Sequence, residues 1–209
     1  NRHIDHSIIK YGYNLSFTIA LPLLIGSSER FIISELLSFK DIAIFSVSLI
    51  FPGIIVAIYG LINRVILPFI TEANNIIEAY AFLKTVYLQI IILFFFISIF
   101  GYYFIEVIIE TFYPKEFYES IFYAELLFIF CAISTPPTFL ANILRAHRII
   151  KFSLIFENIN APAKIILGCI LISYFGLIGI VITYLIIYIF SALFFTCYFI
   201  YEYKTIKHD

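Results

Sequence analysis

The strongest constraint on the fold is a series of apolar segments, each long enough to cross about 30 Å of hydrocarbon as a helix. The six segments cover approximately residues 13–37, 42–62, 86–109, 121–144, 152–174 and 177–201. Strands of a membrane β-barrel would alternate apolar and polar residues with a period of two. Runs such as IIILFFFISIF, residues 90–100, do not alternate. The sequence therefore predicts an all-α, polytopic membrane helix bundle with six transmembrane helices.

The composition supports a lipid environment. Hydrophobic residues make up 63% of the 209 positions and charged residues 13%, against about 25% charged residues in soluble domains. The mean hydropathy is +1.04, so much of the apolar surface is expected to face a lipid bilayer. A net charge of −1 gives no indication of a nucleic-acid partner. Because the chain starts at Asn1 and contains no Met, we expect it to be a piece of a longer protein.

The three cysteines, Cys131, Cys169 and Cys197, lie singly inside apolar runs without a CxxC spacing or a neighbouring histidine cluster. A small thiol packs well among apolar side chains. We therefore expect packing roles for these cysteines, and we expect neither a metal ion nor another cofactor.

The placement of lysine and arginine predicts the orientation. With six spans, the two termini of the segment share one side of the membrane, and that side carries most of the basic residues. They are Arg2, Lys10, Arg145, Arg148, Lys151, Lys204 and Lys207. The opposite side carries Lys40 and Lys115. Since cytoplasmic connections are enriched in basic residues, both termini are expected in the cytoplasm, in the inner or plasma membrane of the cell.

Proline and small residues within the spans are typical of a transporter bundle, although they also occur in ordinary membrane bundles. Each proline removes a backbone donor and favours a kink. These prolines are Pro22, Pro52, Pro136, Pro137 and Pro162. Gly53, Ala57 and Gly60 form a small-residue strip on one helix face, which predicts close helix packing there.

Ionisable residues deep inside the predicted spans are the candidates for a functional site. They are Glu29, Arg30, Glu125, Glu157 and Lys164, with Asn158 and Asn160 beside the last two. A charge at the bilayer centre costs about 2.5–3.5 kcal/mol on insertion scales, so such side chains face the bundle interior or a watery cavity. Glu157 and Lys164 share a helix face, but about 10.5 Å of rise separates them.

Two explanations of these charges remain open. They form either ion pairs between helices that serve assembly, or the lining of a solvated or ligand-binding cavity. Adjacent residues of a helix point about 100° apart, so Glu29 and Arg30 are poorly placed to pair with each other. Comparing depths along the two spans, we predict that Arg30 reaches Glu125 in at least one state of the protein.

Four motifs occur in an order that resembles a known family. They are SSERFIISELLSFKDIAIFSVS (27–48), LINRVILPFITEA (61–73), ANILRAHRIIKF (141–152) and YFGLIGIVITYLI (174–186). Their order and spacing resemble the C-terminal half of a polysaccharide (O-antigen type) flippase of the multidrug/oligosaccharidyl-lipid/polysaccharide exporter superfamily. The resemblance covers nearly the whole chain, although no motif is specific by itself, and the first lobe of the family is missing.

The resemblance implies one six-helix lobe, residues 1–209, of a two-lobe fold with a central cavity. It also implies a transporter rather than an enzyme, which flips a polyprenyl-pyrophosphate-linked oligosaccharide to the outer leaflet by alternating access during lipopolysaccharide or related synthesis. Arg30 best matches the family pattern and would bind the pyrophosphate, with Lys164 as second candidate. Glu29, Glu125 and Glu157 would hold these cations or couple transport to an ion. The polysaccharide polymerase of the pathway is a further candidate partner.

Two other classes of function were weighed against the flippase. A drug/cation antiporter of the same superfamily would share the fold but would favour acidic residues over Arg30 and Lys164. A membrane enzyme of the same sugar pathway would be expected to carry a large extramembrane loop or a clustered acidic metal site. The connections between the predicted spans are short, such as FGLIG at 175–179, which argues against the enzyme.

Overall fold

The computed structural model describes residues 34–149 and 151–208, together with residues 12 and 16, except for the side chains at 151–154, 157–158 and 207–208. The described part is helical and contains no strand. Its elements are α2 (Phe39–Glu72), α3 (Ile76–Phe112), the 3₁₀ turn η1 (Lys115–Phe117), α4 (Glu119–Ser134), α5 (Pro136–Ala146), α6 (Lys151–Phe175) and α7 (Leu177–His208). The predicted all-α class is therefore confirmed for these residues.

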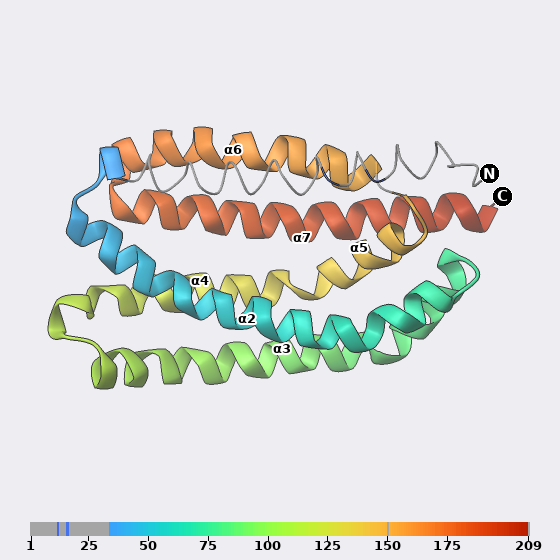
Figure 1. The fold of residues 1–209 in the computed structure, drawn as a ribbon, viewed down its shortest axis with the longest axis horizontal. Helices are drawn as coiled ribbons and strands as arrows, with labels where there is room; N and C mark the ends of the chain where they lie inside the picture. Colours follow the sequence, from blue (N-terminus) through green and yellow to red (C-terminus); the bar gives the residue numbers. More distant parts are fainter. Residues whose placement is uncertain (1–11, 13–15, 17–33, 150, 209) are drawn as a thin grey trace, which may run out of the picture.

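The helices run along the long axis of the molecule, and their connections alternate between its two ends (Figure 1). The start of α2, the connection from α3 to α4 and the turn from α6 to α7 lie at one end, which we call the Lys40 end. The turn from α2 to α3, the connection from α5 to α6 and the C-terminus lie at the other, the Arg148 end. α4 packs against α2, α3 and α7, whereas α6 packs mainly against α7.

Local side-chain chemistry sets the starts of the first two long helices. Ser38 caps α2, because its Oγ accepts a hydrogen bond from the backbone N of Asp41 at 3.2 Å, and the Asp41 carboxylate accepts one from the Ser38 backbone N at 3.2 Å. This reciprocal pair satisfies two backbone donors that a helix start leaves free. Asn75 caps α3 by accepting a hydrogen bond from the backbone N of Glu78 at 2.9 Å. Capping residues of this kind stabilise a helix by about 1 kcal/mol each.

Paired prolines interrupt the predicted span at 121–144. The structure ends α4 at Ser134 and starts α5 at Pro136, with a bend of 43° between the two helices. A proline removes a backbone donor and crowds the preceding turn, and it is well tolerated in the first turn of a new helix. The isolated prolines Pro52, Pro68 and Pro162 lie inside continuous helices.

Glycine is required at two positions for different reasons. Gly176 has a φ of +61° in the turn between α6 and α7, a left-handed conformation that costs other residues about 1–2 kcal/mol. At Gly101 on α3, a Cβ would collide with the ring of Phe128 on α4. No described atom lies within 4 Å of a Cβ built at Gly53 or Gly60, so among the described residues the close helix contact occurs at Gly101, and the packing predicted for that strip stays a prediction.

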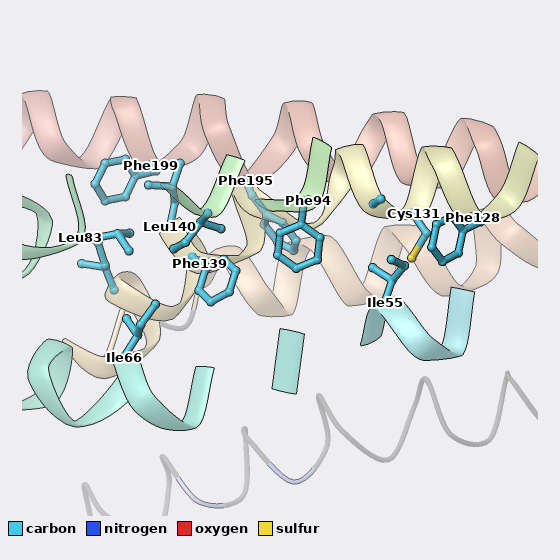
Figure 2. Packing of buried hydrophobic residues seen from close by; sticks show 14 of the residues in the cluster. Ile55, Ile66, Leu83, Phe94, Phe128, Cys131, Phe139, Leu140, Phe195 and Phe199 are labelled. Carbon is cyan, nitrogen blue, oxygen red and sulfur yellow. The ribbon is translucent and has the colours of Figure 1, made fainter. Parts of the chain in front are cut away.

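The core lies where α2, α3, α4, α5 and α7 meet. Figure 2 shows part of it, with Phe94 of α3, Phe139 of α5 and Phe195 of α7 among the buried rings. Large apolar side chains are also exposed along the outer surface of α3, for example Phe95, Phe100 and Phe104. An exposed apolar surface of this extent is expected where helices contact lipid tails rather than water.

Among the described residues, three helices are long and apolar enough to cross a membrane, and the bent pair α4–α5 makes a fourth if it counts as one span. The three are Phe39–Glu72, Ile76–Phe112 and Leu177–Ile206. The described apolar part of α6, Ile159–Phe175, is shorter. The predicted span 13–37 lies almost entirely outside the described residues. A membrane-type helix bundle is thus confirmed in its coarse form, while six spans remain a prediction.

The structure corrects one predicted connection. Residues 63–85 lie between the predicted spans 42–62 and 86–109, but α2 continues to Glu72 and α3 starts at Ile76, so the turn consists only of Ala73, Asn74 and Asn75. With 34 and 37 residues, α2 and α3 are about 51 and 56 Å long at 1.5 Å per residue. Both helices exceed the hydrocarbon thickness of about 30 Å, so their polar ends extend beyond it.

Candidate functional site

Four of the seven predicted site residues cannot be compared with the structure. Glu29 and Arg30 lie outside the described residues, and so do the side chains of Glu157 and Asn158. The predicted contact between Arg30 and Glu125 therefore stays a prediction. Lys164, Asn160 and Glu125 are described.

Lys164 lies at the seam between α6 and α7. Its Nζ sits 3.9 Å from the centroid of the Tyr184 ring, and the side chain is half-buried. Lys164 lies eleven residues before the end of α6 at Phe175, which corresponds to about 16 Å of helix rise. A cation over an aromatic face gains about 0.5–2 kcal/mol, with the larger values in dry surroundings.

The Tyr184 ring, which contacts the Lys164 ammonium group, also packs against two other aromatic rings. It packs edge-on against Phe45 of α2 at 5.7 Å and against Tyr188 of α7 at 6.1 Å between ring centroids. Phe45 is buried in the cluster formed by α2, α4, α6 and α7. The aromatic ring that the Lys164 ammonium group contacts is therefore packed against the interior of the bundle.

Asn160 lies one helical turn before Lys164 on the same face of α6. Its Oδ1 is buried and accepts no hydrogen bond from the residues that the structure describes. Leaving such an acceptor unsatisfied costs about 1–3 kcal/mol, so a donor brought by a ligand or by water would stabilise it. Lys164 and Asn160 thus give this face of α6 a cation and an acceptor one turn apart.

Glu125 on α4 lies near a second carboxylate, Glu106 of α3, which acts on it electrostatically. Glu106 is six residues before the end of α3, and Glu125 is six residues after the start of α4. Both therefore lie about 9 Å along their helices from the Lys40 end. α7 lies between α4 and α6 and packs against both (Figure 1).

Sequence reasoning missed Glu106, because the predicted span ended at 109 and placed this residue near the membrane surface. The helix continues to Phe112. The signal that could have found it is the apolar sequence on both sides, Phe104–Ile105 before it and Val107–Ile108–Ile109 after it.

A second missed feature is a polar cluster between α2 and α5. Asn142 of α5 is 5% exposed, and its Nδ2 donates to Tyr59 Oη at 2.8 Å and to Asn63 Oδ1 at 2.7 Å. Hydrogen bonds between membrane helices contribute about 0.6 kcal/mol each on average. Asn142 lies within the ANILRAHRIIKF motif, which was read only as a connection.

The described residues contain no group of three or more histidine, cysteine or acidic residues that could hold a metal ion. Cys131 is buried, Cys169 half-buried and Cys197 exposed, and all three are free thiols.

The charges of the two ends differ among the described residues. The Arg148 end carries Arg64, Lys84, Arg145, Arg148 and Lys204, against two basic residues, Lys40 and Lys115, at the Lys40 end. His147 adds no charge at neutral pH, since burial lowers the pKa of its imidazole. Arg64 and Lys84 each lie about 12 Å of helix rise from the turn between α2 and α3, in the half of the bundle toward the Arg148 end, and they add to the predicted asymmetry.

No protein-family model, curated protein or solved structure matches the chain. Its geometry is therefore the basis for any statement about its role.

Proposed function

We propose that the chain is the second lobe of a two-lobe flippase, with six spans, which moves a polyprenyl-pyrophosphate-linked oligosaccharide from the cytoplasmic to the outer leaflet of the cell membrane. The observation that carries the proposal is Lys164, a cation about 16 Å from the end of its helix, next to an unsatisfied acceptor on Asn160. A charge at this depth in a membrane bundle is a functional hypothesis by default.

The chemistry of this ligand suits a mid-membrane cation. A pyrophosphate group cannot cross hydrocarbon with its charge uncompensated, whereas its prenyl tail is stable in lipid. Lys164 would supply positive charge along the path, and the Asn160 carbonyl would accept hydrogen bonds from sugar hydroxyls. Arg30 would add a planar guanidinium suited to two parallel contacts with phosphate oxygens.

The charge distribution supports the orientation in this proposal. Five described basic residues gather at the Arg148 end and two at the Lys40 end. Since basic residues stay on the cytoplasmic side of membrane proteins, we place the Arg148 end in the cytoplasm. The short connections between the described helices favour transport over catalysis, because little chain remains outside the membrane for an enzyme site.

The experiment is complementation of a flippase-deficient strain by the complete protein, with membrane abundance measured in parallel. We expect Lys164→Ala and Arg30→Ala to abolish glycan export at normal abundance, and Arg30→Lys to retain part of it because a point charge replaces a fork. Lys115→Ala, an exposed lysine at the Lys40 end, is the matched control and should export normally.

Two outcomes would contradict the proposal. Normal export by both Lys164→Ala and Arg30→Ala at wild-type abundance would remove the anion-binding role. The second outcome is a double variant, in which Arg30 and its carboxylate partner are both neutralised, that exports more glycan than the single Arg30→Ala variant. Arg30 would then serve assembly, because the double variant leaves no unpaired buried charge.

The pair Glu106 and Glu125 favours a second candidate, a drug/cation antiporter of the same superfamily. Two carboxylates at equal depth on adjacent helices attract a cation more strongly than one does. Glu106→Gln and Glu125→Gln should then abolish proton- or sodium-driven efflux of a cationic dye from vesicles. Loss of dye efflux together with intact glycan export would favour the antiporter over the flippase.

A further inference from the structure

A cavity of about 610 Å³ lies between α3, α5 and α7 in the half of the bundle toward the Arg148 end. Three tyrosines and a lysine give it its polar groups: Tyr80 and Tyr87 from α3, and Tyr203 and Lys204 from α7. Leu140 of α5 and Phe199 of α7 belong to its apolar wall, and Figure 2 shows these two side chains together at the edge of the core. We call it the Tyr80 cavity.

Contacts between aromatic rings hold the two helices that line the Tyr80 cavity together. The Tyr80 ring lies 5.0 Å from Phe199 and 4.9 Å from Tyr203, centroid to centroid. These contacts join α3 to α7 across the cavity. A volume of this size falls in the range of about 300–1,000 Å³ that small-molecule sites occupy.

The cavity has a polar mouth and an apolar interior. Along α7 its lining runs from Thr196 to Lys204, which is about 12 Å of rise, with the charged group nearest the Arg148 end. Lys204 forms no hydrogen bond or ion pair among the described residues, and no lining residue is acidic.

This gradient matches the form of a phospholipid in the leaflet at the Arg148 end. Tyrosine side chains are enriched at the level of lipid headgroups, where the ring is in an apolar layer and the hydroxyl is wet. Basic groups between membrane helices bind the anionic heads of lipids, with about 1 kcal/mol for each lysine near the surface. A phosphate beside Lys204 would leave the acyl chains along Phe199 and Leu140.

We propose that the Tyr80 cavity binds one anionic phospholipid, with its phosphate on Lys204 and its acyl chains in the cavity between α3 and α7. The site is separate from Lys164 and from Glu125, since none of the lining residues belongs to α4 or α6. It does not require the proposed transport activity.

The test uses the complete purified protein in detergent, with lipid binding followed by native mass spectrometry. Phosphatidylglycerol, phosphatidylcholine of the same acyl chains, and inorganic phosphate are added separately. We expect phosphatidylglycerol to bind at least fivefold more tightly than phosphatidylcholine, and inorganic phosphate not to displace it. Lys204→Ala should weaken phosphatidylglycerol about fivefold, the factor that corresponds to about 1 kcal/mol, while Lys115→Ala at the opposite end should leave it unchanged.

A second variant tests the apolar part of the site. Ile200 lines the cavity and is 46% exposed, so Ile200→Trp should fill the space without disturbing the core, and it should displace the lipid even with Lys204 in place. Equal binding of both lipids, an equal loss in Lys115→Ala, or unchanged lipid binding by Ile200→Trp would overturn the proposal. Displacement by inorganic phosphate alone would instead indicate a free-anion site, which contradicts it too. So would efficient disulfide dimers of Ile200→Cys in a background without native cysteines, since a second copy would then cover the cavity.

Discussion

The two ends of the bundle are built differently. At the Lys40 end, an ion pair joins the start of α2 to the start of α4, with Lys40 Nζ 3.3 Å from Glu119 Oε1. Glu110 and Glu116 also lie in the sequence at this end. At the Arg148 end, basic residues dominate, and the aromatic contacts of Tyr80 join α3 to α7. The Lys40 end is therefore acidic, whereas the Arg148 end is basic and contains a cavity.

The difference in charge between the two ends comes partly from residues on the helices themselves. Arg64 and Lys84 belong to α2 and α3 rather than to a loop, because these helices extend past the apolar core. A count limited to the predicted loops therefore underestimates the positive charge at the Arg148 end. The asymmetry is a property of helix ends as much as of connections.

The largest expected effect concerns which end faces the cytoplasm. In a background with Cys131, Cys169 and Cys197 replaced, Lys115→Cys should react with an impermeant thiol reagent in intact cells, and Arg148→Cys should react only after permeabilisation. The reason is the positive charge of the Arg148 end. Labelling is measured by gel shift with equal protein amounts. Reaction at 148 but not at 115 in intact cells would reverse the orientation.

The next effect probes the close helix contact in the half toward the Lys40 end. Gly101→Ala places a methyl group against the Phe128 ring, so α3 and α4 must shift, and overpacking of this kind costs about 1–3 kcal/mol. Urea unfolding in mixed micelles measures the free energy of unfolding. Gly60→Ala is the matched control, since no described atom lies within 4 Å of its added Cβ. Equal free energies of unfolding for the two variants would show that α3 and α4 accommodate the added methyl group at no cost, which contradicts the prediction.

A smaller effect is expected in the half toward the Arg148 end. Asn142→Leu removes two hydrogen bonds, to Tyr59 and to Asn63, and should lower the free energy of unfolding by roughly 1 kcal/mol. Ser48→Ala provides the comparison toward the Lys40 end, where Ser48 Oγ lies 3.2 Å from the carbonyl of Ser120 and a loss below that of Asn142→Leu is expected. A larger loss in Ser48→Ala than in Asn142→Leu would reverse this ranking of the two halves.

The smallest effect belongs to the ion pair at the Lys40 end. Both side chains are about 60% exposed, and exposed pairs contribute about 0.2–1 kcal/mol. Lys40→Ala should therefore change the free energy of unfolding by less than about 1 kcal/mol, and the difference should vanish at high salt. A salt-independent loss of several kcal/mol would indicate that the pair is desolvated by something outside the described residues.

The course of the chain was partly predictable from its sequence. Long apolar runs predicted α2, α3 and α7, because hydrophobic length alone identifies a helix that can cross lipid. Helix ends were less predictable: the mixed sequence around Arg64 and Lys84 supports either a helix or a loop, and only the caps at Ser38 and Asn75 decide where the helices start. The sequence predicts a kink at Pro136, whereas the structure has a break there, with two separate helices on either side of Thr135.

The candidate site was less predictable for a geometric reason. Depth follows from position along a helix, so Lys164 could be placed near the membrane centre from sequence. Its contact with Tyr184 depends on how α6 and α7 are rotated about their axes, which no single-helix pattern specifies. Glu106 was missed through an error of three residues in a helix end, and the contacts of Asn142 require the bend at Pro136.

The turn between α6 and α7 determines how the two helices move. Gly176 donates its backbone N–H to the Ile172 carbonyl at 2.8 Å, and Gly179 donates to the Gly176 carbonyl at 3.0 Å, while a Cβ at Gly179 would collide with the backbone of Leu171. So tight a reversal leaves no slack for either helix to slide past the other. We therefore expect α6 and α7 to move as one rigid unit, so that Lys164 of α6 and the Tyr184 ring of α7 stay in contact. Under the proposed function, exposing Lys164 to the other side of the membrane would require α6 and α7 to move together against α4 and α5, the helices that pack on α7.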